Sequence, residues 1–91
     1  MTHMMTLLSL YYLCDQAAAT RGLTREEVQN CMANYEQLKQ EFVQEAPAPL
    51  GSPERAAQNR LGYRSFKSWE DSNSATVQEL RAQARIRLQH N

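Results

Sequence analysis

Glycine, proline, histidine and cysteine are scarce in this chain, and each shortage excludes a kind of functional site. The 91 residues include three glycines, three prolines, two histidines and two cysteines. Because the glycines stand singly, no loop can cradle a phosphate with successive backbone amides. His3 and His90 lie at the two ends, and no pair of residues has the spacing that favours zinc coordination. We therefore expect no metal, no cofactor and no enzymatic activity.

Long apolar runs are also missing. A membrane-spanning helix needs about 20 consecutive apolar residues, and no segment approaches that length, so we expect no membrane insertion. The apolar run at residues 7–14 is preceded by no basic residue and followed by Asp15, which is not typical of a signal peptide. His3 and its neighbours look like a cloning junction, and we interpret residues 1–3 as a cloning remnant.

The two cysteines lie inside apolar helical patterns. Cysteine in such a pattern behaves as a small buried hydrophobe, so Cys14 and Cys31 are predicted to be reduced core residues. Reduced cysteines are typical of a cytoplasmic protein, which is the location we expect. A disulfide between the first two helices is the alternative.

Charge is balanced overall but divided unequally along the chain. Residues 1–50 carry three basic and six acidic side chains, whereas residues 51–91 carry seven basic and four acidic ones. The halves therefore have net charges of −3 and +3. Either the two halves attract each other, within one fold or across a dimer, or the second half faces an external anionic partner.

Residues 24–45 carry the strongest structural signal. Their apolar side chains follow a spacing of 3, 4, 3 and 4, which is typical of a helix that buries one narrow seam. These side chains are Val28, Cys31, Tyr35, Leu38 and Phe42. Thr24 and Glu27 form a capping box at the start of this helix, and Gly22 is suited to end the helix before it. The short connection predicts an antiparallel helical hairpin.

Two further helices are predicted in the second half. A proline-rich connector at residues 46–52 separates them from the hairpin, and Ser52 with Pro53 is a favourable helix start. Gly62 weakens the third helix and is expected to bend or break it. A fourth helix follows at residues 75–89. The sequence therefore predicts one all-α domain, residues 1–91, with three or four helices.

The first helix, residues 4–20, is apolar around most of its circumference, and such a helix must be buried on most sides. We expect a chain of this length to be too short to cover it, which predicts a homodimer. The predicted oligomer surface consists of Leu7, Leu8, Leu10, Tyr11, Tyr12 and Cys14.

Residues 63–69 combine aromatic and basic side chains more densely than any other segment. Tyr35 and Phe66 lie on the apolar stripes and suit the core, whereas Tyr12 and Tyr63 lie off them and suit an interface. The predicted protein-binding surface consists of Arg60, Tyr63, Arg64, Phe66, Lys67 and Trp69. Large aromatics with arginine dominate the energetics of protein interfaces, and the cations would attract an acidic partner.

The sequence thus predicts a small non-catalytic regulator, inhibitor or chaperone that binds a protein. As a class it resembles small bacterial and phage proteins of this kind, although no motif identifies a family. A small DNA- or RNA-binding regulator that uses the same basic residues is the alternative. A structural subunit of a larger assembly is a third class.

Overall fold

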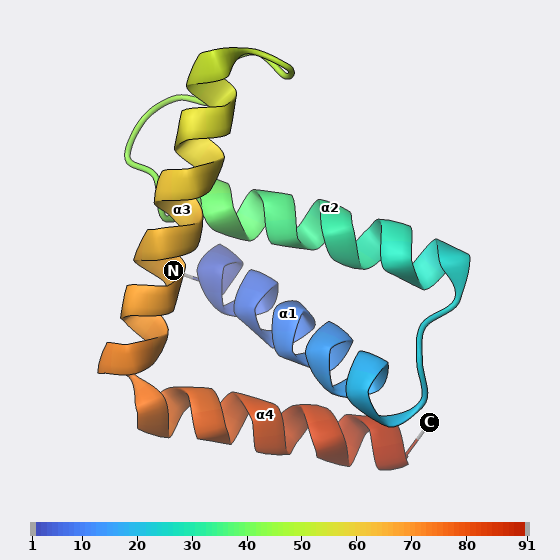
Figure 1. Ribbon diagram of the computed structural model, residues 1–91. Helices are drawn as coiled ribbons and strands as arrows, with labels where there is room; N and C mark the ends of the chain where they lie inside the picture. The colour runs from blue at the N-terminus through green and yellow to red at the C-terminus, as the bar shows by residue number, and fades with distance from the viewer. Residues whose placement is uncertain (1, 91) are drawn as a thin grey trace.

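Four helices form the part of the chain, residues 2–90, that the computed structural model describes (Figure 1). They are α1 at Thr2–Thr20, α2 at Arg25–Glu41, α3 at Pro53–Ser72 and α4 at Ser74–Gln89. No strand occurs among these residues, and the predicted all-α class is confirmed. None of the four helices has both the length and the hydropathy to cross a membrane.

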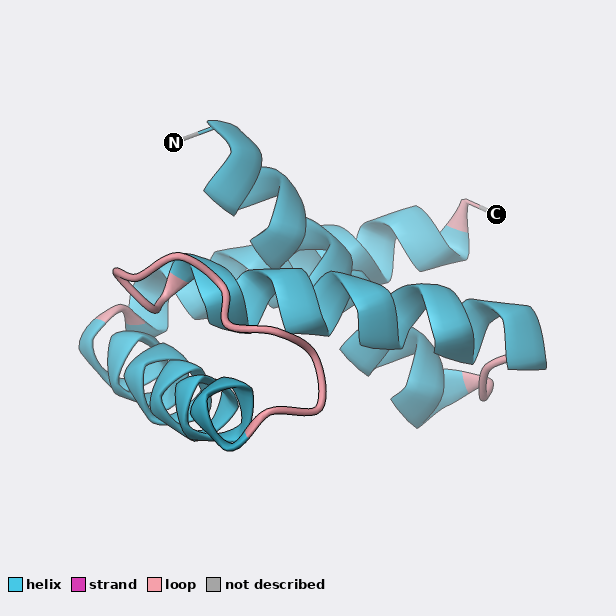
Figure 2. Ribbon diagram, turned by 90° about the horizontal axis from the view of Figure 1, so that it is seen from above, coloured by secondary structure: helices cyan, strands magenta, loops and turns pink. Residues whose placement is uncertain are grey.

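The first helix occupies the middle of the fold. α1 lies between α2 and α4 and packs against both, while α3 crosses one end of the assembly (Figure 1). From above, α1 passes diagonally beneath α2 (Figure 2). The two run in opposite directions, which confirms the predicted hairpin. Because α2 and α4 cover it from two sides, α1 can bury apolar side chains on both.

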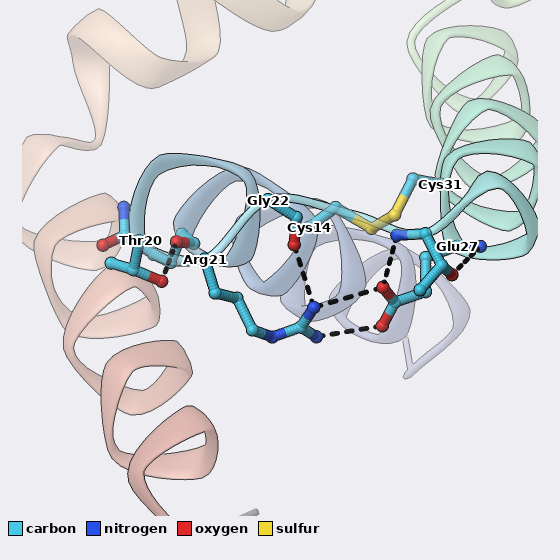
Figure 3. Close-up of polar contacts among 8 residues, drawn as sticks. Cys14, Thr20, Arg21, Gly22, Glu27 and Cys31 are labelled. Carbon is cyan, nitrogen blue, oxygen red and sulfur yellow. Dashed lines mark hydrogen bonds and ion pairs between the residues drawn. A yellow bond between two sulfur atoms is a disulfide. The ribbon is translucent and has the colours of Figure 1, made fainter.

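Local sequence signals fix the hairpin turn. Gly22 adopts a φ of 80°, and its amide donates to the Ala17 carbonyl at 3.0 Å, which ends α1. The capping box is present: the Glu27 amide donates to the Thr24 hydroxyl at 3.1 Å, and the Thr24 amide donates to the Glu27 carboxylate at 2.9 Å. Arg21 also donates to that carboxylate (Figure 3). These hydrogen bonds, from Arg21 above all, hold the pKa of Glu27 at about 2.

The connector is ordered by side chains of α3. Gln58 is 8% exposed; its amide nitrogen donates to the Ala46 carbonyl, and its amide oxygen accepts from the Ala48 amide. Arg55 donates to the Ala48 carbonyl at 3.0 Å. Ser52 caps α3 as predicted, since its hydroxyl accepts from the Arg55 amide. The proline-rich segment is therefore tied back onto the helix that follows it.

The core joins all four helices. Its largest fully buried side chains are Leu8, Tyr12, Leu38 and Phe66. α4 contributes Val77, Leu80 and Ala84 to the same core. Tyr11 packs edge-on against Tyr12 and Phe66, with ring centroids 5.0 and 4.9 Å apart.

α2 ends four residues before the predicted boundary. Phe42 lies just beyond the helix and packs on Phe66, and Val43 is 6% exposed.

The burial of α1 differs from the prediction. Leu7, Leu8 and Tyr12 are 3%, 1% and 0% exposed, so the chain itself covers three residues that were assigned to an oligomer surface. Tyr11 is half-buried against neighbouring rings, and Leu10 remains 37% exposed. The second protomer was predicted because the chain was expected to be too short to cover α1, but α4 covers the side of α1 opposite α2. The homodimer therefore has no structural support, and oligomeric state stays a prediction.

The cysteines also differ from the prediction. Cys14 of α1 and Cys31 of α2 form a disulfide, with their Cα atoms 6.0 Å apart (Figure 3). The reduced state was therefore wrong, and the alternative of a disulfide between the first two helices is present. None of the residues Arg25–Asn34 of α2 is fully buried, so burial contributes little at this end of the hairpin. The disulfide and the hydrogen bond from the Asn34 side chain to the Leu7 carbonyl link the two helices there.

Removal of this disulfide should destabilise the fold. A cross-link that closes a loop of about 15 residues contributes about 3 kcal/mol in the chain-entropy treatment, and Cys14 and Cys31 are 17 residues apart. The double variant Cys14→Ser, Cys31→Ser is expected to lose about 2–4 kcal/mol of unfolding free energy, measured by urea denaturation. A reductant should destabilise the parent protein to the same extent and leave the double variant unchanged. Equal stability of parent and variant would contradict this.

Gly62 permits the closest approach between α2 and α3. The sequence predicted a bend or a break at Gly62, and the structure shows no break, because α3 is continuous through this residue. A Cβ atom at this position would lie 2.9 Å from the carbonyl carbon of Lys39 and closer still to its oxygen. Because those atoms belong to the backbone of α2, they can move only if the helices separate. The glycine is thus required by packing rather than by chain flexibility.

Replacement of Gly62 by alanine tests this packing. Helix propensity alone would stabilise the alanine variant by about 1 kcal/mol. We expect the opposite sign, a loss of about 1–3 kcal/mol from overpacking, measured as the free energy of unfolding in urea. Ser68→Ala, at an exposed position of the same helix, is the control and should be neutral or slightly stabilising. A stabilised Gly62→Ala protein would show that the crossing is not tight.

Candidate functional site: an aromatic and basic groove between α2 and α3

A groove of about 470 Å³ follows the crossing of α2 and α3. Its lining residues come from both helices and are mostly aromatic or basic. They are Tyr35, Lys39, Asn59, Arg60, Tyr63 and Arg64. Three of the six, Arg60, Tyr63 and Arg64, belong to the protein-binding surface predicted from the sequence. We call this feature the aromatic–basic groove.

The close contact at Gly62 positions the α3 side of the groove. Tyr63 directly follows Gly62, and its side chain stands 48% exposed beside α2. Arg60 and Arg64 are exposed and one helical turn apart, so their guanidinium groups can reach the same ligand. On the α2 side the cation has partners within its own helix: the Lys39 ammonium lies 4.7 Å from the centroid of the Tyr35 ring and 2.9 Å from the Glu36 carboxylate. α2 therefore supplies a supported wall and α3 the free cations.

The ion pairs do not neutralise the positive half of the chain. Within residues 2–90 the pairs are Arg21–Glu27, Lys39–Glu36, Lys67–Glu70 and Arg81–Glu70. Each of them joins two groups of the same half, and none joins the acidic half to the basic one. Arg60 and Arg64 take part in no ion pair of this part of the chain. Attraction between the halves through direct ion pairs, the first explanation of the charge split, is therefore not observed.

The remaining predicted site residues lie elsewhere. Phe66 is 0% exposed and forms part of the core, while Trp69 is half-buried and packs on Phe42. The Lys67 ammonium lies 2.8 Å from the Glu70 carboxylate. The structure thus separates the predicted surface into a groove, a core aromatic and an internal ion pair. Phe66 is not available to a partner.

Sequence reasoning missed three lining residues, Tyr35, Lys39 and Asn59. Tyr35 was assigned to the core because it lies on the apolar stripe of α2, yet it is only half-buried and its ring borders the groove. The i, i+4 spacing of Tyr35 and Lys39 indicates a shared helix face. No sequence signal shows which face of α3 meets them, because this depends on the tight crossing at Gly62.

A half-buried carboxylate, that of Glu70, links α3 to α1 and α4 next to the predicted surface. The Tyr12 hydroxyl donates to Glu70 at 2.6 Å, and the Arg81 guanidinium lies 4.0 Å from the same carboxylate. Burial would raise the pKa of Glu70, but the hydrogen bonds from Lys67 and Tyr12 and the positive charges of Lys67 and Arg81 hold this pKa below its usual range. Burial, with the hydrogen bond to Glu70, raises the pKa of the Tyr12 phenol far above its usual value.

The lowered pKa of Glu70 predicts a pH dependence of stability. A carboxylate whose pKa is lower in the folded state stabilises the fold above its unfolded pKa, about 4.3 for glutamate. That contribution is lost as the pH falls through the folded pKa. We expect Glu70→Gln to reduce the free energy of unfolding by about 1–3 kcal/mol at pH 7, and the difference from the parent to shrink below about pH 4.

Urea denaturation at pH 7, 5 and 3.5 measures this effect. Asp71→Asn is the matched control, because Asp71 is the exposed neighbour of Glu70 and has the same charge. The control should differ little from the parent at any of these pH values. A Glu70→Gln penalty that stays constant down to pH 3.5 would show that ionisation of Glu70 does not contribute.

No family or relative assigns a role to these features. Comparisons with known protein families, with curated proteins and with solved structures found no match to this chain. Among residues 2–90, no group of three or more His, Cys, Asp or Glu side chains is placed to hold a metal ion.

Proposed function

We propose that this chain is a non-catalytic binding protein that docks an acidic segment of a protein partner in the aromatic–basic groove. By occupying that segment it would regulate, chaperone or block its partner. The observation that carries the proposal is the pair Arg60 and Arg64, which flank exposed Tyr63 and have no ion-pair partner within residues 2–90.

The chemistry of the groove suits carboxylates on a protein surface. A guanidinium group can donate two parallel hydrogen bonds to one carboxylate, which gives geometric specificity as well as attraction. Tyr35 and Tyr63 add apolar ring surface with a polar tip, a combination that is enriched in the centres of protein interfaces. Positive charge at the groove would also accelerate encounter with an acidic partner.

The distribution of the other cations favours a protein over a nucleic acid. Tracking a phosphate backbone requires several free cations along one surface. Lys67, which belongs to the basic surface predicted from the sequence, faces the Glu70 carboxylate, and so does Arg81. Only Arg60 and Arg64 remain unpaired on α3 beside the groove. Binding of DNA or RNA thus becomes an outcome to be tested rather than the preferred function.

The disulfide bears on the compartment in which the protein would act. A cytoplasmic location was inferred from reduced cysteines, and that inference loses its basis because Cys14 and Cys31 are bonded. Disulfides persist mainly in oxidising compartments, which we propose for this protein. The groove is formed by one chain, so the proposal does not depend on the homodimer predicted from the sequence.

Photo-cross-linking tests the proposed docking site. A photoreactive phenylalanine analogue in place of Tyr63, in cells that naturally make the protein, should yield an adduct whose cross-linked peptide contains acidic residues. Arg60→Ala with Arg64→Ala should reduce the adduct at least tenfold. Arg85→Ala with Arg87→Ala removes the same charge from exposed positions of α4 and should leave it intact.

Three results would overturn the proposal. An adduct yield that falls equally in both double variants would indicate general charge attraction only. A cross-linked peptide without acidic residues would contradict the proposed ligand. Retardation of a random 20-base-pair duplex in a low-salt gel, with release at a log–log salt slope near −0.9 per phosphate contact, would assign the groove to nucleic acid.

A further inference from the structure

A second groove, of about 240 Å³, lies beside the disulfide between α1 and α2. We call it the disulfide groove. Its walls are mostly apolar and include Tyr11, Leu23, Val28, Met32 and the two bonded cysteines. Val28 is 38% exposed and Met32 is 64% exposed, although both are apolar residues of an ordered helix. The part of α2 that contributes least to the core therefore presents apolar side chains at the surface.

The disulfide groove continues into the aromatic–basic groove through a shared residue. Tyr35 lines both of them. Its ring packs on Tyr11 of the disulfide groove with centroids 5.3 Å apart, and it carries the Lys39 ammonium 4.7 Å from its centroid. One surface thus follows α2, with apolar side chains near the start of the helix and cations near its end.

We propose that the two grooves form one bipartite binding surface, and that its partner segment carries apolar residues next to acidic ones. This inference rests on the proposed function and extends it. Apolar side chains of the partner would fill the disulfide groove, and the apolar surface that this contact removes from water would supply affinity. Its carboxylates would meet Arg60 and Arg64, which fix position and orientation.

A negative charge at the disulfide groove sets the direction in which the partner segment binds. Asp15 is exposed and lines the disulfide groove. A carboxylate of the partner placed beside it would be repelled, whereas at the other end it would face two unpaired guanidinium groups. The segment should therefore bind in one orientation, with its acidic residues beside α3.

The length of α2 gives the spacing required in the partner. Lys39 is the α2 residue that lines the same groove as Arg60 and Arg64. The centre of Val28 and Met32 lies about nine residues before Lys39, so the two ends of the surface are about 14 Å apart along α2 at a helical rise of 1.5 Å per residue. A helical partner would need about nine residues between its apolar and acidic clusters. An extended partner would need only about four residues, at roughly 3.3 Å each.

Selection from a display library of random 16-residue peptides on the disulfide-bonded protein tests this inference. Enriched peptides should combine an apolar cluster and an acidic cluster at one of these two spacings. Met32→Glu should weaken the best peptide at least tenfold. Ala33→Glu adds the same charge at the next exposed position, outside the groove, and should change its affinity less than twofold. Met32→Ser serves as a second variant with no added charge.

The selection separates the two proposals. Enriched peptides that are acidic but lack an apolar cluster, with affinity unaffected by Met32→Glu and Met32→Ser, would overturn the bipartite surface and leave the acidic docking site standing. Peptides without acidic residues, or with affinity unaffected by Arg60→Ala and Arg64→Ala, would overturn the proposed function as well. Both clusters at the expected spacing, each sensitive to its own variants, would support the bipartite surface.

Discussion

The hydrogen bond between the Tyr12 phenol and the Glu70 carboxylate is the interaction on which the arrangement of helices depends. The Tyr12 side chain is 0% exposed in the middle of the fold, and its hydroxyl needs an acceptor. A buried hydroxyl left without a partner costs about 1–3 kcal/mol. Glu70 supplies the acceptor from α3, and the carboxylate in turn attracts Lys67 and Arg81. One half-buried carboxylate therefore joins α1, α3 and α4 at the edge of the apolar core.

Local sequence signals predicted the helices of this fold better than they predicted which helices pack together. The capping box at Thr24, the left-handed Gly22 and the Ser52 cap act over a few residues, so the sequence shows them directly. The cover of α1 depends on contacts with a helix that lies more than fifty residues away, and no periodicity reports it. The prediction that Cys14 and Cys31 are reduced was wrong for a related reason. An apolar helical pattern suits a buried thiol and a disulfide between helices equally well.

The sequence predicted the side of the candidate site that α3 forms, but not the side that α2 forms. Exposed aromatic and basic residues on one helix were recognisable, and Arg60, Tyr63 and Arg64 do line one groove. Phe66 was placed on a partner surface even though its spacing also suited the core, because composition cannot decide which aromatic residues point inward. The opposite wall, from α2, required knowledge of the helix crossing. That crossing is set by the absence of one Cβ atom at Gly62.

The position of α1 between α2 and α4 has a consequence for folding during synthesis of the protein. α1 is synthesised before α4, yet these two helices pack against each other. The hairpin can pair early and form its disulfide, but one flank of α1 stays exposed until α4 has been synthesised. Contacts between distant parts of a chain form late and leave apolar surface exposed in the meantime. Any product released before α4 is synthesised would therefore carry an open, aggregation-prone flank.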